Sequence, residues 1–315
     1  TPDDIVVGSP PLAFTFGLGG LVLFPLRVGA SAVLLERAPP DELLAAIARY
    51  RATVCFTAPT AYRAMLAKLG DHDASSLRKC VSAGEHLPKA TFEAWEQATG
   101  LKLLDGIGAT EMLHIFIAAR EEDIRPGATG KAVPGYEAKV IDENGADLPP
   151  NSIGRLAVRG PTGCRYLADQ RQRKYVVEGW NVTGDTYMMD SDGYFWYQAR
   201  SDDMIISAGY NIAGPEVESV LLSHPAVAEC GVVGQPCPER GMIVKAYIVL
   251  KPGVVGDAAL VKTLQDFVKQ EVAPYKYPRA IEFTPNLPRT ETGKLQRFAL
   301  RERAAQEALQ PRGAA

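Results

Sequence analysis

The stretch NVTGDTYMMDSDGYFWYQARSDDMIISAGYNIAGPEVE, residues 181–218, decides how this chain is divided. A Thr-Gly-Asp turn is predicted at 183–185, and an acidic turn at 190–193 closes a hairpin onto the aromatic strand 194–197. A charged break at 200–203 is followed by a short apolar run and a helical phrase. Charged residues between two apolar strands indicate that one folding unit ends there and another begins. Because carboxylates and an arginine gather at this join, the same stretch is a candidate functional site.

The part of the chain before this stretch alternates between strand and helix patterns. Strands are expected at 6–7, 31–35, 53–57, 77–82 and 101–104, with helices at 41–50, 58–69 and 88–99. Strands separated by helical segments predict parallel crossovers, and therefore an α/β layer fold for 1–125. The apolar run 11–26 is interpreted as strand, including the segment PLAFTFGLGG.

From residue 126 to 201 short strands and turns predominate, and Asn144-Gly145 is a strong hairpin signal, so this part is expected to form a β-rich subdomain. Residues 202–305 contain a further set of helices and strands with their own apolar residues, which predicts a small α+β domain. Residues 306–315 are interpreted as a tail.

Composition narrows the class of protein. The 315 residues give room for two domains, and the apolar content of 46% and charged content of 23% are those of an ordinary globular protein. A net charge of −3 argues against a nucleic-acid binder, and no apolar run is long enough to span a membrane. The five cysteines form no C-x-x-C pair and the four histidines are dispersed, so neither a redox motif nor a zinc site is indicated. We expect a cytoplasmic protein, and the opening Thr1 suggests a piece of a longer one.

Two predicted loops could bind a ligand, because ligands in α/β folds lie beyond the carboxyl ends of the strands. One is 82–85 and the other is 105–111. Their glycines allow the backbone to approach a ligand closely, and Thr110 and Glu111 carry the hard oxygen ligands that Mg²⁺ prefers. Taken alone, the second loop could equally be a turn before an ordinary helix.

Other polar residues also allow two interpretations. Asp185 could accept the hydroxyls of a ribose or be a turn residue, and Arg200 could hold an anion or pair with a nearby acid. Lys294 could neutralise a developing negative charge, although it could also be one exposed lysine. The aromatic and glycine residues at 10–20 could line a flat apolar pocket or belong to the core.

Five separated motifs, taken together, favour the functional interpretations: SAGEHLP, DGIGATE, NVTGD, ARSDDMIISAGYNIAGPEVE and PRTETGK. In this order they resemble the acyl- and aryl-CoA synthetases of the adenylate-forming superfamily, over essentially the whole chain. The resemblance implies the C-terminal part of a large AMP-binding domain at 1–201, with α/β layers and a small β-barrel subdomain, followed by a mobile domain at 202–305. It also implies two half-reactions, in which an acid and Mg·ATP give an acyl-adenylate and CoA then displaces AMP.

The resemblance assigns roles to individual residues. Those implied at the nucleotide are Gly84, Glu85, Asp105, Gly106, Ile107, Asp185 and Arg200, with Thr110 at the phosphates and Glu111 holding Mg²⁺. Lys294 would bridge the substrate carboxylate and the α-phosphate, and Asp202 would be the hinge. Those implied along the CoA channel are Gly209, Tyr210, Tyr275 and Lys276.

Within the superfamily the motifs resemble the benzoate and 2-aminobenzoate CoA ligases of aromatic degradation. The residues expected to form the aryl pocket are Phe14, Thr15, Phe16, Gly17, Ile107 and His114. His114 could reach a ring substituent or simply pack. The pocket segment has no Asp to pair with an α-ammonium group, which argues against a peptide-synthetase domain.

Several alternatives remain open: a medium-chain or alicyclic acyl-CoA synthetase, a carrier-protein-loading domain, or an inactive fragment that only binds nucleotide. The Gly-rich Ser/Thr phosphate loop of the superfamily does not occur in the 315 residues, so this polypeptide alone is not expected to adenylate efficiently. The expected partners are an aromatic carboxylate, ATP and CoA, with neither nucleic acid nor membrane. A homodimer, and an acetyltransferase and deacetylase acting on Lys294, are also kept open.

Overall fold

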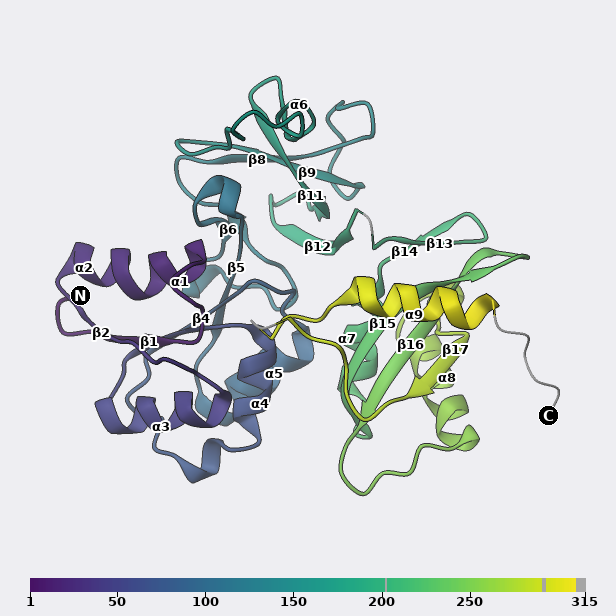
Figure 1. The fold of residues 1–315 in the computed structure, drawn as a ribbon, viewed down its shortest axis with the longest axis horizontal. Helices are drawn as coiled ribbons and strands as arrows, with labels where there is room; N and C mark the ends of the chain where they lie inside the picture. The colour runs from purple at the N-terminus through teal and green to yellow at the C-terminus, as the bar shows by residue number, and fades with distance from the viewer. Residues whose placement is uncertain (202, 291–292, 310–315) are drawn as a thin grey trace. The chain divides into compact units, whose positions relative to one another are not determined.

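The structure, a computed structural model, describes residues 1–201, 203–290 and 293–309 (Figure 1). The chain forms two compact units, Thr1–Tyr197 and Gln198–Ala315, so the division falls inside the stretch 181–218.

The first unit is built on a sheet with the order β2-β1-β3-β4-β5-β6-β7. Its strands are β1 (Ile5–Gly8), β2 (Ser31–Val33), β3 (Val54–Thr57), β4 (Lys79–Ala83), β5 (Leu103–Gly108), β6 (Ile115–Ala118) and β7 (Lys131–Ala132). The strands from β2 to β5 pair in parallel, whereas β6 and β7 pair antiparallel. This sheet confirms the predicted α/β class, and it places the carboxyl ends of β3, β4 and β5 at one edge.

One face of the sheet is covered by α3 (Pro40–Tyr50), α4 (Pro59–Leu66) and α5 (Lys89–Thr99). Helix α3 begins at a proline, and Asp41 and Glu42 in its first turn complement the helix dipole. Its buried residues Leu43, Leu44 and Ile47 recur at helical spacing and belong to the same core as Val7 of β1. Burial of each of these aliphatic side chains contributes about 2 kcal/mol.

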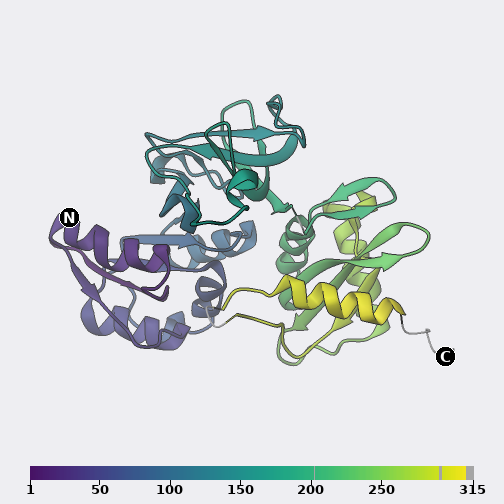
Figure 2. The ribbon, with the colours of Figure 1, turned by 45° about the horizontal axis from the view of Figure 1, so that its top comes forward.

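The other face of β1 is covered by helix rather than by the strand expected at 11–26. The segment forms α1 (Thr15–Leu18), a π-helix η1 (Gly19–Leu23) and α2 (Phe24–Val28), which Figures 1 and 2 show opposite α3. The strand expectation is wrong because a short apolar run has the same composition in a buried helix. The glycines suit the helical packing, since a Cβ at Gly20 would come within 2.8 Å of the ring of Phe56.

The β-rich subdomain follows. A second sheet has the order β10-β11-β9-β8, and β12 also pairs with β11. Its strands are β8 (Glu137–Ile141), β9 (Ile153–Arg159), β10 (Val176–Val177), β11 (Trp180–Met189) and β12 (Phe195–Arg200). The remaining short helices of the first unit are η2 (Leu69–Asp71), η3 (Thr110–Met112) and η4 (Glu121–Asp123) in its α/β part, and α6 (Gln172–Tyr175) in the β-rich part.

Two predicted loops are strand instead. The turn expected at 183–185 lies within β11, where the pairing with β9 shifts register between Val182 and Thr186. Gly184 has a φ of 78°, so the shift is a β-bulge that a glycine makes accessible. Residues 105–108, expected as loop, extend β5 because they pair with β4 and β6.

The second unit has a sheet of its own with the order β14-β13-β16-β15, and β17 pairs in parallel with β16. Its elements are β13 (Ile205–Ser207), β14 (Tyr210–Ile212), α7 (Gly214–Ser223), β15 (Val227–Cys237), β16 (Gly241–Leu250), α8 (Ala258–Glu271), η5 (Pro274–Lys276), β17 (Ala280–Phe283) and α9 (Arg297–Leu309). A separate core, including Val217, Ile248 and Leu264, fills the space between its sheet and helices.

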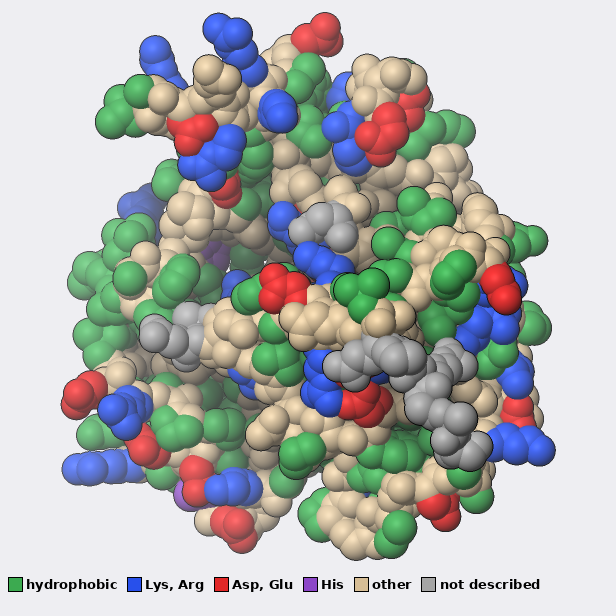
Figure 3. Space-filling view, turned by 45° about the vertical axis from the view of Figure 1, so that its right-hand side comes forward, with side chains coloured by type: hydrophobic (Ala, Val, Ile, Leu, Met, Phe, Trp, Pro, Cys, Tyr) green, Lys and Arg blue, Asp and Glu red, His purple; other side chains and the backbone are tan. Residues whose placement is uncertain are grey.

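On the face in Figure 3, basic and acidic side chains are interspersed among the described residues. A search of the described helices finds none whose length and apolar character would let it cross a membrane.

Candidate nucleotide and acid site

The sheet of the first unit brings the two glycine-rich motifs together. Ser82 pairs with Asp105, and Ala83 pairs with Gly106, because β4 and β5 are neighbours. Gly84 therefore leaves the sheet beside the strand that carries Ile107. Its φ of 90° lets the chain turn sharply at this edge.

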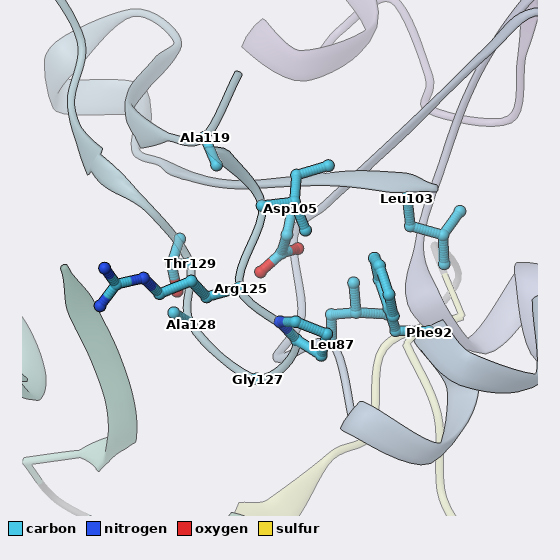
Figure 4. Close-up of a pocket in the computed structure, with 11 residues that line it drawn as sticks. Leu87, Phe92, Leu103, Asp105, Ala119, Arg125, Gly127, Ala128 and Thr129 are labelled. Atoms are coloured by element: carbon cyan, nitrogen blue, oxygen red, sulfur yellow. The ribbon is translucent and has the colours of Figure 1, made fainter. Parts of the chain in front are cut away.

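A pocket lies beside this edge, and Asp105 faces it (Figure 4). Its apolar wall includes Leu87 and Phe92, while residues 125–129 form the opposite side. In Figure 4 the carboxyl group of Asp105 points into this space, whereas the guanidinium group of Arg125 points away from it. The pocket has a volume of about 10 Å³, which is room for a single water molecule, and Asp105 and Thr129 line it among mainly apolar residues.

One oxygen of the Asp105 carboxyl group lacks a partner within the described part of the chain. Its Oδ1 is buried without a hydrogen bond, and so is the neighbouring Ser82 hydroxyl. Burial raises the pKa of Asp105 to about 7, although Ser82 and the Gly106 amide favour the ionised form. Because buried polar atoms are nearly always hydrogen-bonded, Oδ1 is a candidate acceptor for a ligand.

Glu85 is held at the start of the next loop. Its Oε2 accepts a hydrogen bond from the Thr60 hydroxyl at the start of α4. The following His86 stacks on Tyr197, with ring centroids 5.3 Å apart. These contacts fix the backbone of the SAGEHLP motif on either side of Gly84.

Thr110 and Glu111 lie in η3, directly after β5. Thr110 is exposed, and the Oε1 of Glu111 accepts a hydrogen bond of 2.7 Å from the hydroxyl of Tyr166. This bond to the Glu111 carboxylate raises the pKa of Tyr166. Sequence reasoning missed Tyr166 because its contact joins segments 55 residues apart.

Asp185 is positioned by the bulge in β11. Its amide donates to the hydroxyl of Thr183 at 3.2 Å, which organises the bulged residues. A bulge redirects side chains relative to a regular strand, so Asp185 owes its direction to this irregularity. Arg200 is exposed at the end of β12 and belongs to the second unit.

The residues expected at an aryl group are brought together only in part. Phe16 lies 5.8 Å from His114 between ring centroids. Phe14 is 52% exposed, and Gly17 packs against the turn before α1, where a Cβ would meet the carbonyl of Pro11 at 2.3 Å. Thr15 begins α1, and Ile107 packs against the core beneath the β-rich subdomain.

His114 lies among aromatic rings that include two the sequence did not single out. The ring centroid of Phe24 lies 4.7 Å from that of His114, and the ring centroids of Phe16 and Phe56 are 5.9 Å apart. Burial lowers the pKa of His114, and its Nε2 has no partner within the described residues. A Cβ at Gly19 would come within 2.6 Å of that nitrogen, so one edge of the ring packs on η1.

In the second unit, Gly209 forms the turn of the β13–β14 hairpin with a φ of 83°. Tyr210 stacks on Tyr275 with ring centroids 4.4 Å apart, which brings together two of the residues expected along the CoA channel. The amine of Lys276, which follows Tyr275, is held by Glu216 at 2.6 and 2.7 Å.

Lys294 is exposed after Gly293, and its amide donates to the Thr290 hydroxyl at 3.1 Å. The expected hinge residue, Asp202, lies outside the described residues.

This sheet, with its glycine-lined edge and the separate smaller unit, is the architecture of an AMP-binding enzyme. The AMP-binding enzyme family profile matches residues 1–166, and the profile of the AMP-binding enzyme C-terminal domain matches residues 216–294. The chain therefore belongs to the AMP-binding enzyme family.

Comparison with individual proteins shows which AMP-binding enzymes the chain resembles. The chain is 42% identical to the benzoate–CoA ligase of Thauera aromatica over 307 residues, which cover 95% of the chain and 58% of that protein. It is 41% identical to the mouse (Mus musculus) mitochondrial acyl-coenzyme A synthetase ACSM3 over 85% of the chain and 48% of that protein. Among solved structures, it matches the anthranilate CoA ligase AuaEII in complex with anthranoyl-AMP, with a TM-score of 0.94, 44% identity and coverage of 98% of this chain and 61% of the other. The chain thus spans about half of the length of the curated relatives it matches.

Proposed function

We propose that this chain supplies the nucleotide site and the mobile domain of an AMP-forming ligase that converts an aromatic acid, benzoate or 2-aminobenzoate, into its CoA thioester. In the first step the carboxylate attacks the α-phosphate of ATP, giving the aryl-adenylate and releasing pyrophosphate. In the second step the CoA thiol attacks the acyl carbon, and AMP leaves as the thioester forms. The resemblance to benzoate and anthranilate CoA ligases supports the substrate class.

The observation that supports the nucleotide site is the buried Oδ1 of Asp105, which has no hydrogen-bond partner among the described residues and faces a small, mainly apolar pocket. The edge of an adenine carries an amino group that could donate to this oxygen. Gly84, Glu85, Gly106 and Ile107 would then border the base, since β4 and β5 bring them to the same edge.

The remaining groups divide between the two half-reactions. Asp185 and Arg200 would hold the ribose, Thr110 would contact the phosphates, and Glu111 would hold the Mg²⁺ that neutralises their charge. Lys294 would bring the substrate carboxylate to the α-phosphate. Gly209, Tyr210, Tyr275 and Lys276 would serve the approach of CoA after rotation about Asp202. Acetylation of Lys294 would remove its charge and so block the first step.

Calorimetry on this polypeptide tests the nucleotide site directly. AMP and a non-hydrolysable benzoyl-adenylate analogue are expected to bind, and Asp105→Leu is expected to weaken both by about tenfold, which corresponds to one lost hydrogen bond to a charged group. The matched control is Asp3→Leu, a change at an exposed carboxylate in the same unit. Wild-type affinity in Asp105→Leu would contradict this nucleotide site.

The activity is tested by ATP–pyrophosphate exchange. The 315-residue polypeptide is expected to give little exchange with benzoate, because the Gly-rich phosphate loop is absent from its sequence. The full-length protein is expected to exchange. Efficient exchange by the polypeptide alone would contradict the first expectation.

A second candidate substrate class is a medium-chain or alicyclic acid, because the chain is also 41% identical to an acyl-coenzyme A synthetase. A comparison of benzoate, 2-aminobenzoate, cyclohexanecarboxylate and octanoate in the full-length protein separates the two. A preference for octanoate would replace the aryl assignment while leaving the ligase class unchanged.

A further inference from the structure

The loop between β9 and β10 contacts the turn that carries Glu111, although no motif of the sequence pointed to it. The hydroxyl of Tyr166 in this loop donates to Oε1 of Glu111 at 2.7 Å. The bond joins two segments of the same unit, on opposite sides of the β8–β9 hairpin in the sequence.

The loop is fastened to the turn at a second point. The hydroxyl of Thr162 donates to the carbonyl of Met112, the last residue of η3, at 2.8 Å. Tyr136, just before β8, shares a hydrogen bond of 2.7 Å with the same Thr162 hydroxyl. The loop and the Glu111 turn are therefore connected through both a backbone carbonyl and a side chain.

The base of Tyr166 is also held in place. Its amide donates to Oε1 of Gln172 at 2.7 Å, and the Gln172 side chain donates to the Cys164 carbonyl at 3.1 Å. The Cys164 amide in turn donates to Oδ1 of Asn181 on β11 at 3.2 Å. The Tyr166 ring lies against Tyr175, with centroids 5.8 Å apart, which limits its rotation.

A glutamate in a single short turn has several rotatable bonds, so its carboxylate would otherwise sample many positions. A hydrogen bond to one oxygen removes that freedom and leaves the other oxygen available to accept from a ligand or to bind a cation. Groups that orient a metal-binding carboxylate in this way commonly change metal affinity by 10- to 100-fold when they are removed.

We propose that Tyr166 is a positioning residue that holds the Glu111 carboxylate in the orientation needed for Mg²⁺ on the nucleotide phosphates. The inference rests on the proposed function, in which Glu111 holds the metal. Tyr166 acts through Glu111 and has no direct part in the chemistry.

The test compares Tyr166→Phe with wild type in the full-length protein, because the change removes only the hydroxyl. Calorimetry measures ATP affinity with Mg²⁺ and with EDTA, AMP affinity without metal, and the Mg²⁺ concentration that half-saturates ATP binding. We expect the half-saturating Mg²⁺ concentration to rise about tenfold, while AMP affinity stays at the wild-type value.

Tyr136→Phe is the matched control, because it removes a phenol hydroxyl that holds the same loop without touching Glu111. This variant is expected to keep the wild-type Mg²⁺ requirement. An equal rise in both variants would overturn the proposal, since general ordering of the loop would then account for the effect.

A double-mutant cycle tests whether Tyr166 acts through Glu111, which a purely structural role of Tyr166 would not require. In a Glu111→Gln background, Tyr166→Phe is expected to cause no further change in the Mg²⁺ requirement. An unchanged requirement in Tyr166→Phe alone would overturn the inference. By contrast, if the unsubstituted protein bound ATP equally well with and without Mg²⁺, the proposed function itself would be contradicted. A failure of the inference about Tyr166 is therefore distinct from a failure of the proposed function.

Discussion

Asp105 illustrates how far a single residue can be interpreted from sequence. The DGIGATE motif marked it as a nucleotide residue, but only the packing of β5 against Leu87 and Phe92 shows that its Oδ1 is buried without a partner among the described residues. Its environment turns an ordinary carboxylate into one whose pKa is about 7.

The raised pKa of Asp105 predicts how stability depends on pH. Between about pH 4 and pH 7 the folded protein binds a proton that the unfolded chain has lost, so the free energy of unfolding should fall as pH rises. Asp105→Asn removes the titrating group, so its free energy of unfolding should not show this fall. The difference in the free energy of unfolding between Asp105→Asn and wild type should therefore change in favour of the variant by about 2–4 kcal/mol from pH 4 to pH 8. Urea unfolding without ligand, measured across this range, checks the prediction. Parallel curves for the two proteins would refute it.

Lys294 gives a second prediction at this scale. Lys294→Ala in the full-length protein should reduce ATP–pyrophosphate exchange by at least 100-fold, because removal of a preorganised charge from a transition state costs about 3 kcal/mol. Thioester formation from preformed benzoyl-adenylate should be spared. Lys262→Ala, an exposed lysine of the same unit, is the control and should affect neither step. Equal loss of both steps in Lys294→Ala would contradict the division of roles.

At the scale of elements, the alternation of strands and helices in 1–125 was predictable, because the spacing of apolar residues that is typical of each element appears in the local sequence. The segment 11–26 was not, since its helical form depends on close contacts such as that between Gly20 and Phe56. The bulge in β11 was also hidden, because it is a mismatch with β9 rather than a property of the NVTGD motif.

The bulge carries a prediction of its own. Gly184→Ala places a Cβ at a φ of 78°, which costs about 1 kcal/mol and should shift the residues on either side. AMP affinity should therefore fall, because Asp185 follows directly. Gly193→Ala, at a φ of 81° in the turn before β12, should cost similar stability without affecting AMP binding. Calorimetry and urea unfolding of both variants make the comparison, and an unchanged AMP affinity in Gly184→Ala would count against the role of the bulge.

At the scale of the whole molecule, the two units have separate cores. The second also has a buried Lys245 paired with Glu282 and Glu307, which ties α9 to β16 and β17. A unit with its own core and its own charged network is expected to be stable without the other.

A polypeptide of residues 198–315 should consequently fold alone. Circular dichroism should show its helices and strands, and urea should unfold it in one cooperative transition. Leu264→Ala, which removes a fully buried side chain, should destabilise it by about 2–5 kcal/mol. The absence of a cooperative transition in the unsubstituted polypeptide would show that this unit depends on the first.

The stretch 181–218 shows where sequence was sufficient and where it was not. The sequence by itself determined the family and the α/β class, because motif order, period and composition are local properties of the chain. Tertiary structure alone decided that Asp185 is directed by a bulge, that Oδ1 of Asp105 is buried without a partner among the described residues, and that Tyr166 holds Glu111. Each of these depends on contacts between segments far apart in the chain, whose register and burial no local pattern encodes.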